Sequence, residues 1–89
     1  MRKIILNLEK MRSIAMLHKH LHMALALPEY YGANLDALYD CLTELAEPTE
    51  LVVPQKVADE EYLGWYGQQL VQVLQDAAEV NKSLKITLQ

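Results

Sequence analysis

Residues 28–41 decide the fold of this chain and read Pro28-Glu29-Tyr30-Tyr31-Gly32-Ala33-Asn34-Leu35-Asp36-Ala37-Leu38-Tyr39-Asp40-Cys41. Proline disfavours helical geometry at the residue before it, so a preceding helix should end at Leu27. Gly32 can adopt a positive φ at no steric cost, which would let a short loop turn back. The first half of the stretch therefore predicts a tight loop.

The second half of the stretch predicts a helix over residues 35 to about 46. Asn34 is a good N-cap, and Asp36 in the first turn suits the positive end of the helix dipole. On a helical wheel, one side of this segment is apolar and is typical of a core-facing surface. That side comprises Leu35, Leu38, Leu42 and Leu45, flanked by Ala37 and Cys41.

The other side of the predicted helix is acidic. Asp36, Asp40 and Glu44 repeat at a spacing of four with no Lys or Arg among them. Like charges at this spacing cost a helix roughly 0.2–0.5 kcal/mol per pair. A solvated acidic face is one interpretation, and a surface that meets positive charge is the other. Aromatic residues beside carboxylates are typical of protein–protein hot spots, and three tyrosines accompany the row: Tyr30, Tyr31 and Tyr39.

These residues resemble the barstar family, the small intracellular inhibitors of secreted guanyl-preferring ribonucleases. The resemblance is carried by three runs: Leu25-Ala26-Leu27-Pro28-Glu29-Tyr30-Tyr31-Gly32, Asn34-Leu35-Asp36-Ala37-Leu38 and Asp40-Cys41-Leu42-Thr43. Weaker matches lie on both sides of these runs: Arg12-Ser13-Ile14, Leu17-His18, Val73, Ala77 and an apolar last strand. The resemblance thus spans the chain, and its centre is the most specific part.

The resemblance implies a role for each matching residue. Asp40 is the expected anchor for the arginines and histidine that hold the scissile phosphate of RNA. Asp36 is expected to engage a further arginine, and Tyr30 to lie against the catalytic histidine. The other implied partner-binding residues are Tyr31, Gly32, Asn34 and Leu35 in the loop, Tyr39 and Thr43 along the helix, and Asp76 on a later helix. Glu44 is also expected in the contact, where it adds a negative charge at the rim that the family pattern does not have.

The sequence departs from the type member of the family around the same surface. That protein has tryptophan in place of Tyr39 and Leu45, a small residue in place of Glu44 and an acidic residue in place of Ala33. The identity of the preferred ribonuclease therefore stays open.

Length and charge limit the classes of function. The 89 residues predict one domain, residues 1–89, and the net charge of −4 favours a basic partner over nucleic acid. No apolar run is long enough for a membrane span, and the short apolar run after Met1 does not fit a secretory signal. The single cysteine, Cys41, excludes a disulfide framework and predicts a cytoplasmic protein.

A metal site and an enzyme are two further interpretations that the sequence favours less. His18 and His22 lie one turn apart, but a zinc site needs three or four ligands and no third is evident. These histidines and His20 are expected to face solvent or to be partly packed. Carboxylates on one exposed helix face share a solvent and lack the cleft that acid–base catalysis needs, so we expect no enzyme and no cofactor.

The remaining pattern predicts an α/β fold. The expected order is strand, helix, helix, strand, helix, helix, strand, with three parallel strands packed against three to four helices and the first strand in the middle. Predicted strands cover residues 3–8, 51–53 and 84–88, and Pro54 places the second at a sheet edge. Ser13 should cap the first helix and Asn81 should end the last, residues 68–80.

Residues 55–67 give the weakest pattern. A short helix is expected near residues 57–63, with Gly64 and Gly67 interrupting the chain before the last helix. Trp65 and Tyr66 are expected to be packing residues, and the alternative is an exposed pair that would widen a binding surface.

Together these observations predict an inhibitor that binds a barnase-like ribonuclease one-to-one and blocks its active site. A non-inhibitory adaptor that docks a basic partner through the same acidic face is the alternative.

Overall fold

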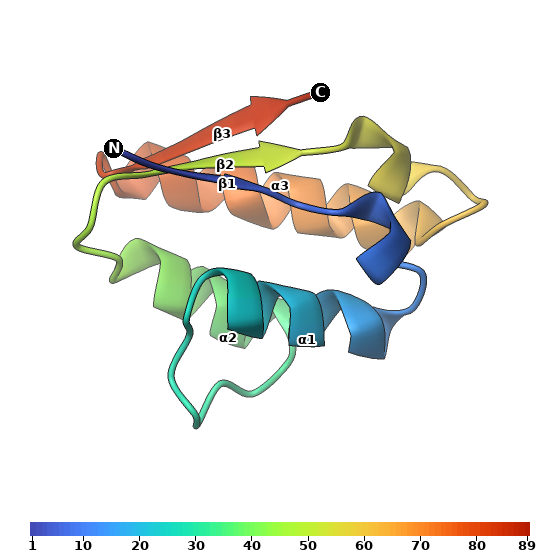
Figure 1. Ribbon diagram of the computed structural model, residues 1–89, viewed down its shortest axis with the longest axis horizontal. Helices are drawn as coiled ribbons and strands as arrows, with labels where there is room; N and C mark the ends of the chain where they lie inside the picture. Colours follow the sequence, from blue (N-terminus) through green and yellow to red (C-terminus); the bar gives the residue numbers. More distant parts are fainter.

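The computed structural model describes residues 1–89 and shows a three-stranded parallel sheet with its helices gathered on one side (Figure 1). This confirms the predicted α/β class and the barstar-like arrangement. The elements in order are β1 (Arg2–Ile5), α1 (Ile14–Ala24), α2 (Leu35–Thr43), β2 (Thr49–Val53), α3 (Gly64–Val80) and β3 (Leu84–Leu88), with 3-10 turns η1 (Leu8–Lys10) and η2 (Gln55–Ala58). None of the helices is long and apolar enough to cross a membrane.

The strand order is β1-β2-β3, so the prediction that the first strand lies in the middle is wrong. The prediction of an edge position for Leu51-Val52-Val53 is wrong for the same reason, because β2 pairs with both neighbours. Pro54 follows the last residue of β2, so its missing N–H removes no bond from the ladder. Three consecutive buried aliphatic residues suit a central parallel strand better than an edge.

The sheet buries one face under the helices. Leu51 and Val53 point into the core, where they meet Leu17 and Leu21 of α1 and Leu70 of α3 in one cluster. The other face is open and carries Lys3, Glu50 and Lys85 in register across the three strands. These three charged side chains favour exposure of this row to water, whereas Val52 on the same face is buried.

Several predicted boundaries differ from the structure. The first strand ends at Ile5, because Leu8 begins the turn η1, and the acidic helix ends at Thr43 rather than near residue 46. The short helix expected near residues 57–63 is the 3-10 turn η2. Gly64 and Gly67 lie inside α3, so they do not interrupt the chain before it.

Trp65 at the start of α3 is 70% exposed, which contradicts its predicted packing role, whereas Tyr66 is half-buried against the core. The two side chains leave adjacent positions of one helix and therefore point about 100° apart. Only Tyr66 faces the interior.

The end of α1 takes the Schellman form that the sequence did not predict. The N–H of Leu27 donates to the carbonyl of His22 (3.0 Å), and the N–H of Ala26 donates to that of Met23 (3.3 Å). Ala26 has φ of 50°, a conformation that glycine occupies without a steric penalty. The strain at this position is the cost of using alanine where glycine is usual.

The variant Ala26→Gly is therefore expected to stabilise the fold by about 0.5–1 kcal/mol. Relief of the left-handed alanine outweighs the extra freedom that glycine gives the unfolded chain. Urea unfolding measures the difference, with Ala15→Gly, an exposed position inside α1, as a control that should lose about 1 kcal/mol. A loss of stability in Ala26→Gly contradicts this account of the turn.

Candidate functional site

Residues 28–34 form the second part of the connection between α1 and α2 and are fixed by hydrogen bonds at the start of α2. The side-chain oxygen of Asn34 accepts a hydrogen bond from the N–H of Ala37 (2.7 Å), which confirms its predicted capping role. Its amide nitrogen donates to the carbonyl of Gly32 (3.2 Å). One side chain therefore both begins the helix and fixes the last turn of the loop.

The turn itself occurs one residue later than predicted. Ala33 has φ of 54°, whereas Gly32 does not have a positive φ. A Cβ atom on Gly32 would lie 3.2 Å from Nδ2 of Asn34 and 3.4 Å from Cβ of Ala37. Glycine at position 32 therefore allows close packing against the helix start rather than an unusual backbone angle.

The apolar side of α2 is fixed by its packing against the core. Leu38 and Leu42 are completely buried, and Leu35 and Leu45 pack partly against the same core, as the wheel predicted. Beyond its end, the amide of Asn81 donates to the carbonyls of Leu42 (2.9 Å) and Leu45 (2.8 Å). Asn81 also ends α3 as predicted, through its own N–H to Ala77, so one residue joins the ends of both helices.

The acidic residues of α2 and of its C-cap, Glu44, face solvent. Asp36, Asp40 and Glu44 are exposed, and none of them forms an ion pair. The two ion pairs of the chain lie elsewhere, between Arg2 and Glu47 (3.7 Å) and between Arg12 and Glu9 (2.8 Å). Three carboxylates on a fixed helix are thus available to cations of another molecule.

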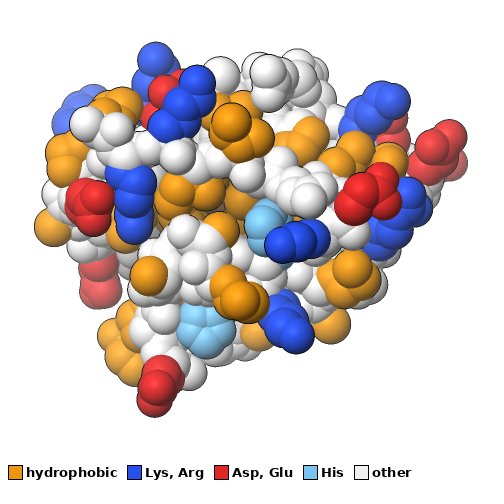
Figure 2. Space-filling model, viewed as in Figure 1, with side chains coloured by type: hydrophobic (Ala, Val, Ile, Leu, Met, Phe, Trp, Pro, Cys, Tyr) orange, Lys and Arg blue, Asp and Glu red, His pale blue; other side chains and the backbone are white.

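The basic residues are segregated from this surface. No Lys or Arg occurs in residues 20–55, whereas five of the eight lie in the first 19 residues. Figure 2 shows Lys and Arg side chains on the face formed by β1 and α1. Asp and Glu side chains lie among them on that face, whereas the segment that carries the acidic row of α2 contains no Lys or Arg, which favours an encounter of this row with a positively charged partner.

The three tyrosines near the acidic row have different environments. Tyr30 is 84% exposed, Tyr31 is only 9% exposed, and Tyr39 is half-buried against the core. Tyr30 is free to contact a partner, whereas Tyr31 is a structural anchor of the loop. The sequence alone did not distinguish these two neighbours.

His18 of α1 is 2% exposed, which corrects the expectation that it faces solvent or is partly packed. Its Nδ1 lies 2.5 Å from the hydroxyl of Tyr31, and its Nε2 lies 2.7 Å from the hydroxyl of Tyr66. Burial lowers the pKa of His18 and raises the pKa values of Tyr31 and Tyr66. The imidazole is therefore held neutral between two neutral phenols.

This burial predicts a pH dependence of stability. Because the folded-state pKa of His18 lies below the ordinary value of 6.5, the unfolded chain binds the proton more readily. Stability should fall as the pH drops from about 6.5 to the folded-state pKa, by at most about 1.4 kcal/mol per pH unit, and should not change through this group above that range. Urea unfolding of the parent and of His18→Gln between pH 5 and 7.5 measures this contribution as the difference in slope, and equal slopes contradict it.

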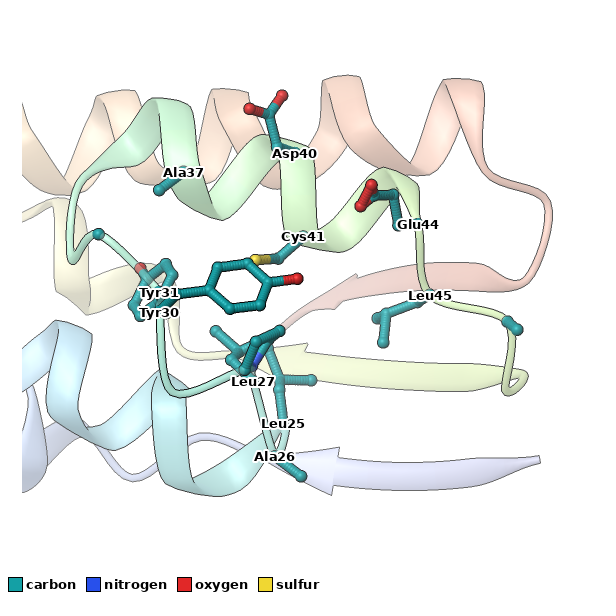
Figure 3. A pocket seen from close by; sticks show the side chains of 13 residues that line it. Leu25, Ala26, Leu27, Tyr30, Tyr31, Ala37, Asp40, Cys41, Glu44 and Leu45 are labelled. Carbon is teal, nitrogen blue, oxygen red and sulfur yellow. The ribbon is translucent and has the colours of Figure 1, made fainter.

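An open hollow of about 570 Å³ lies between the loop and α2. Figure 3 shows Asp40 and Glu44 on the α2 side, Leu25 and Ala26 on the opposite side, and the tyrosine rings between them. Five of the predicted residues line it: Tyr30, Tyr31, Gly32, Asp40 and Glu44. The other lining residues, which the prediction did not include, are Leu25, Ala26, Leu27, Pro28, Ala37, Cys41, Leu45 and Ala46.

The other predicted residues lie outside this hollow. Asn34, Leu35 and Asp36 belong to the start of α2, and Tyr39 and Thr43 lie further along the same helix, with the Thr43 hydroxyl donating to the carbonyl of Asp40 (2.9 Å). Asp76 is exposed on α3 and accepts a hydrogen bond from Gln72 (2.9 Å). The helices α2 and α3 pack together, but Asp76 forms no hydrogen bond or ion pair with the loop.

No group of three or more His, Cys, Asp or Glu side chains is arranged to hold a metal ion. Cys41 is half-buried at the hollow, and burial, followed by the charges of Glu44 and Asp40, raises the pKa of its thiol. A thiol kept protonated in this way is a poor nucleophile. The arrangement is suited to contact with a cationic partner, not to covalent chemistry.

Comparison with known proteins identifies the family of this chain. Residues 1–89 match the family described as "Barstar (barnase inhibitor)". A Bacillus subtilis (strain 168) protein named "Putative ribonuclease inhibitor YrdF" is 41% identical over 80 residues, which cover 89% of this chain and 88% of that protein. A match over the full length, together with an α/β fold that carries a tyrosine loop and an acidic helix, shows that this chain belongs to the barstar family.

Proposed function

We propose that this protein inhibits a barnase-like, guanyl-preferring ribonuclease by binding one-to-one and filling its active site with the tyrosine loop (residues 28–34) and α2. The observation that carries the proposal is the row of Asp36, Asp40 and Glu44, exposed and without a cation partner on a rigidly held helix. Membership of a family described as barnase inhibitors, and the name of the Bacillus subtilis relative, support the same role.

The chemistry of inhibition follows from what a ribonuclease must provide. An enzyme that cleaves a phosphodiester surrounds the phosphate with Arg, Lys and His side chains. Carboxylates can take the place of the phosphate, and Arg–carboxylate pairs are often bidentate, which adds geometric selectivity to the attraction. Unlike RNA, the carboxylate row of α2 offers no phosphodiester bond to cleave. The protein therefore acts as an inhibitor and not as an enzyme.

Rigid support of α2 favours tight binding. Leu38 and Leu42 fix the helix from the core side, and Asn81 fixes its end, so the spacing between Asp36 and Asp40 is set before the partner arrives. Association then costs less ordering of side chains and backbone. Tyr30, already exposed beside the hollow, supplies an aromatic contact of the kind that dominates interface energies.

Titration of purified guanyl-preferring ribonucleases with the protein, followed by RNA cleavage, tests the proposal. Stoichiometric loss of activity with one equivalent of protein is the expected result for the preferred enzyme. Binding without loss of activity, measured in parallel by calorimetry, indicates the alternative, an adaptor that docks a basic surface away from the active site. The same titration with several ribonucleases identifies the preferred enzyme. It thereby tests whether this chain, which departs from the type member at Tyr39 and Glu44, prefers a different ribonuclease.

Association with the target ribonuclease is expected to slow steeply as salt increases. The carboxylates are solvent-exposed, so their long-range attraction is screened over about 8 Å at physiological ionic strength. Stopped-flow association rates between 10 and 500 mM NaCl should fall by one to two orders of magnitude, roughly the range that steering adds, while dissociation rates change much less. An association rate independent of salt contradicts steering by the acidic face.

A further inference from the structure

We propose that His18 is a positioning residue for partner binding. It bridges Tyr66 of α3 to Tyr31 of the tyrosine loop and so fixes the loop in its binding conformation. This inference rests on the proposed function, because it assumes that the loop contacts the ribonuclease. His18 itself lies inside the fold, so it does not contact the ribonuclease in this proposal.

The bridge joins three separate parts of the chain. His18 projects from α1, Tyr31 belongs to the loop, and Tyr66 lies in the first turns of α3, 48 residues further along the sequence than His18. The imidazole ring lies 5.7 Å from the ring of Tyr31 and 6.0 Å from that of Tyr66, centre to centre. The loop is thereby connected to the most extended helix of the core.

Tyr31 is the one buried side chain in residues 28–34. Glu29, Tyr30, Gly32, Ala33 and Asn34 are exposed, and Pro28 is half-buried. The N–H of Tyr31 also donates to the carbonyl of Pro28 (2.9 Å), so the same residue closes the turn of the loop. A change in the position of the Tyr31 ring must therefore move the backbone that carries Tyr30 and Gly32.

The hydrogen-bonding capacity of the bridge is complete. A neutral imidazole has one donor and one acceptor, and each phenol hydroxyl can serve as either, so both ring nitrogens are satisfied. No carboxylate is within ion-pairing distance of His18, and the ionisable groups that face this cluster are Tyr31, Tyr66, His22 and Cys41. With both nitrogens bound, the imidazole has a single favourable orientation, and that orientation fixes the Tyr31 hydroxyl.

Removing one end of the bridge should loosen the other. The variant Tyr66→Phe keeps the ring but removes the hydroxyl that holds Nε2 of His18. Nothing in the proposed binding surface is altered, because Tyr66 does not line the hollow and lies outside the loop and α2. Any effect on binding must therefore pass through His18 and Tyr31.

The experiment compares the dissociation rate of the ribonuclease complex for the parent, Tyr66→Phe and the control Tyr62→Phe. Tyr62 packs under Arg12 (5.0 Å from the ring centre) and takes no part in the hydrogen bonds of the bridge. Tyr66→Phe should dissociate about three- to tenfold faster, the size of one lost hydrogen bond, with association unchanged, and Tyr62→Phe should match the parent. In a Tyr31→Phe background, Tyr66→Phe should have little further effect, which a purely structural role does not predict.

A second measurement does not depend on the partner. Amide exchange of the Tyr31 N–H in the free protein should become faster in Tyr66→Phe and stay unchanged in Tyr62→Phe, because the turn to Pro28 loses its side-chain anchor. If the parent inhibits but Tyr66→Phe shows parental dissociation and parental exchange, the positioning role is wrong and the proposed function stands. If no ribonuclease is inhibited, the proposed function is wrong. If amide exchange of the Tyr31 N–H in Tyr66→Phe is slower than or equal to that of the parent, the bridge is wrong, whatever the result with ribonucleases.

Discussion

The variant Asp40→Ala is expected to weaken the complex with the target ribonuclease by about 2–5 kcal/mol, mainly through faster dissociation. Asp40 is exposed in the middle of the acidic row and also lines the hollow beside the tyrosines. Its removal leaves buried cations of the enzyme without a counter-charge, and this penalty dominates the loss. This magnitude is the one typical of such truncations in the barnase–barstar complex.

A matched control separates the position of the charge from the charge itself. Glu79 is exposed on α3 beside Ile86 of β3, away from the hollow, so Glu79→Ala removes one negative charge without touching the acidic row. This variant should lower the association rate slightly and leave dissociation unchanged. Surface plasmon resonance at fixed salt gives both rates. Asp40→Ala binding as tightly as the parent removes Asp40 from the anchor role.

The variant Gly67→Ala is expected to destabilise the fold by about 2–4 kcal/mol. A Cβ atom on Gly67 would lie 2.0 Å from the carbonyl oxygen of Val57 and 2.8 Å from Cα of Ala58. Both atoms belong to the backbone of η2, so no side-chain rotation relieves the overlap, and α3 must move away from η2. That movement disturbs the core around Val57, which is completely buried.

Gly64→Ala provides the comparison within the same helix. Gly64 has φ of +52°, but an added Cβ atom would meet nothing within 4 Å. Backbone strain is the only destabilising effect of alanine at this position. Alanine also restricts the unfolded chain, which partly offsets the strain, so the free energy of unfolding should fall by about 0.5–1 kcal/mol. Urea unfolding of the two variants distinguishes steric overlap from strain. Equal losses in both contradict the close packing of α3 on η2.

The two large predicted effects concern different properties of the protein, binding for Asp40→Ala and folding stability for Gly67→Ala. Asp40 belongs to the proposed interface and its side chain is exposed, whereas Gly67 packs against η2 inside the fold. Asp40→Ala should therefore keep or slightly raise the stability of the parent, because it removes two like-charge pairs from α2. Gly67→Ala should keep its affinity as long as it remains folded.

Local sequence determined much of this protein. Asn34 and Ser13 cap their helices as predicted, since a capping side chain acts on backbone groups two or three residues away. The four-residue spacing of Asp36, Asp40 and Glu44 places them on the exposed side of α2, opposite Leu38 and Leu42, because a helix has a fixed period. The family and the α/β class also followed from the residues alone.

Only the tertiary structure decided which partners meet across long sequence separations. The central position of β2, the burial of His18 between Tyr31 and Tyr66, and the contact of Gly67 with η2 all join segments that no local pattern relates. Position 33, not Gly32, adopts the positive φ because the loop must close between two helices already fixed in the core. The intrinsic propensity of a residue limits the backbone conformations that it can adopt. Packing of the whole chain then determines which of these conformations it adopts in the fold.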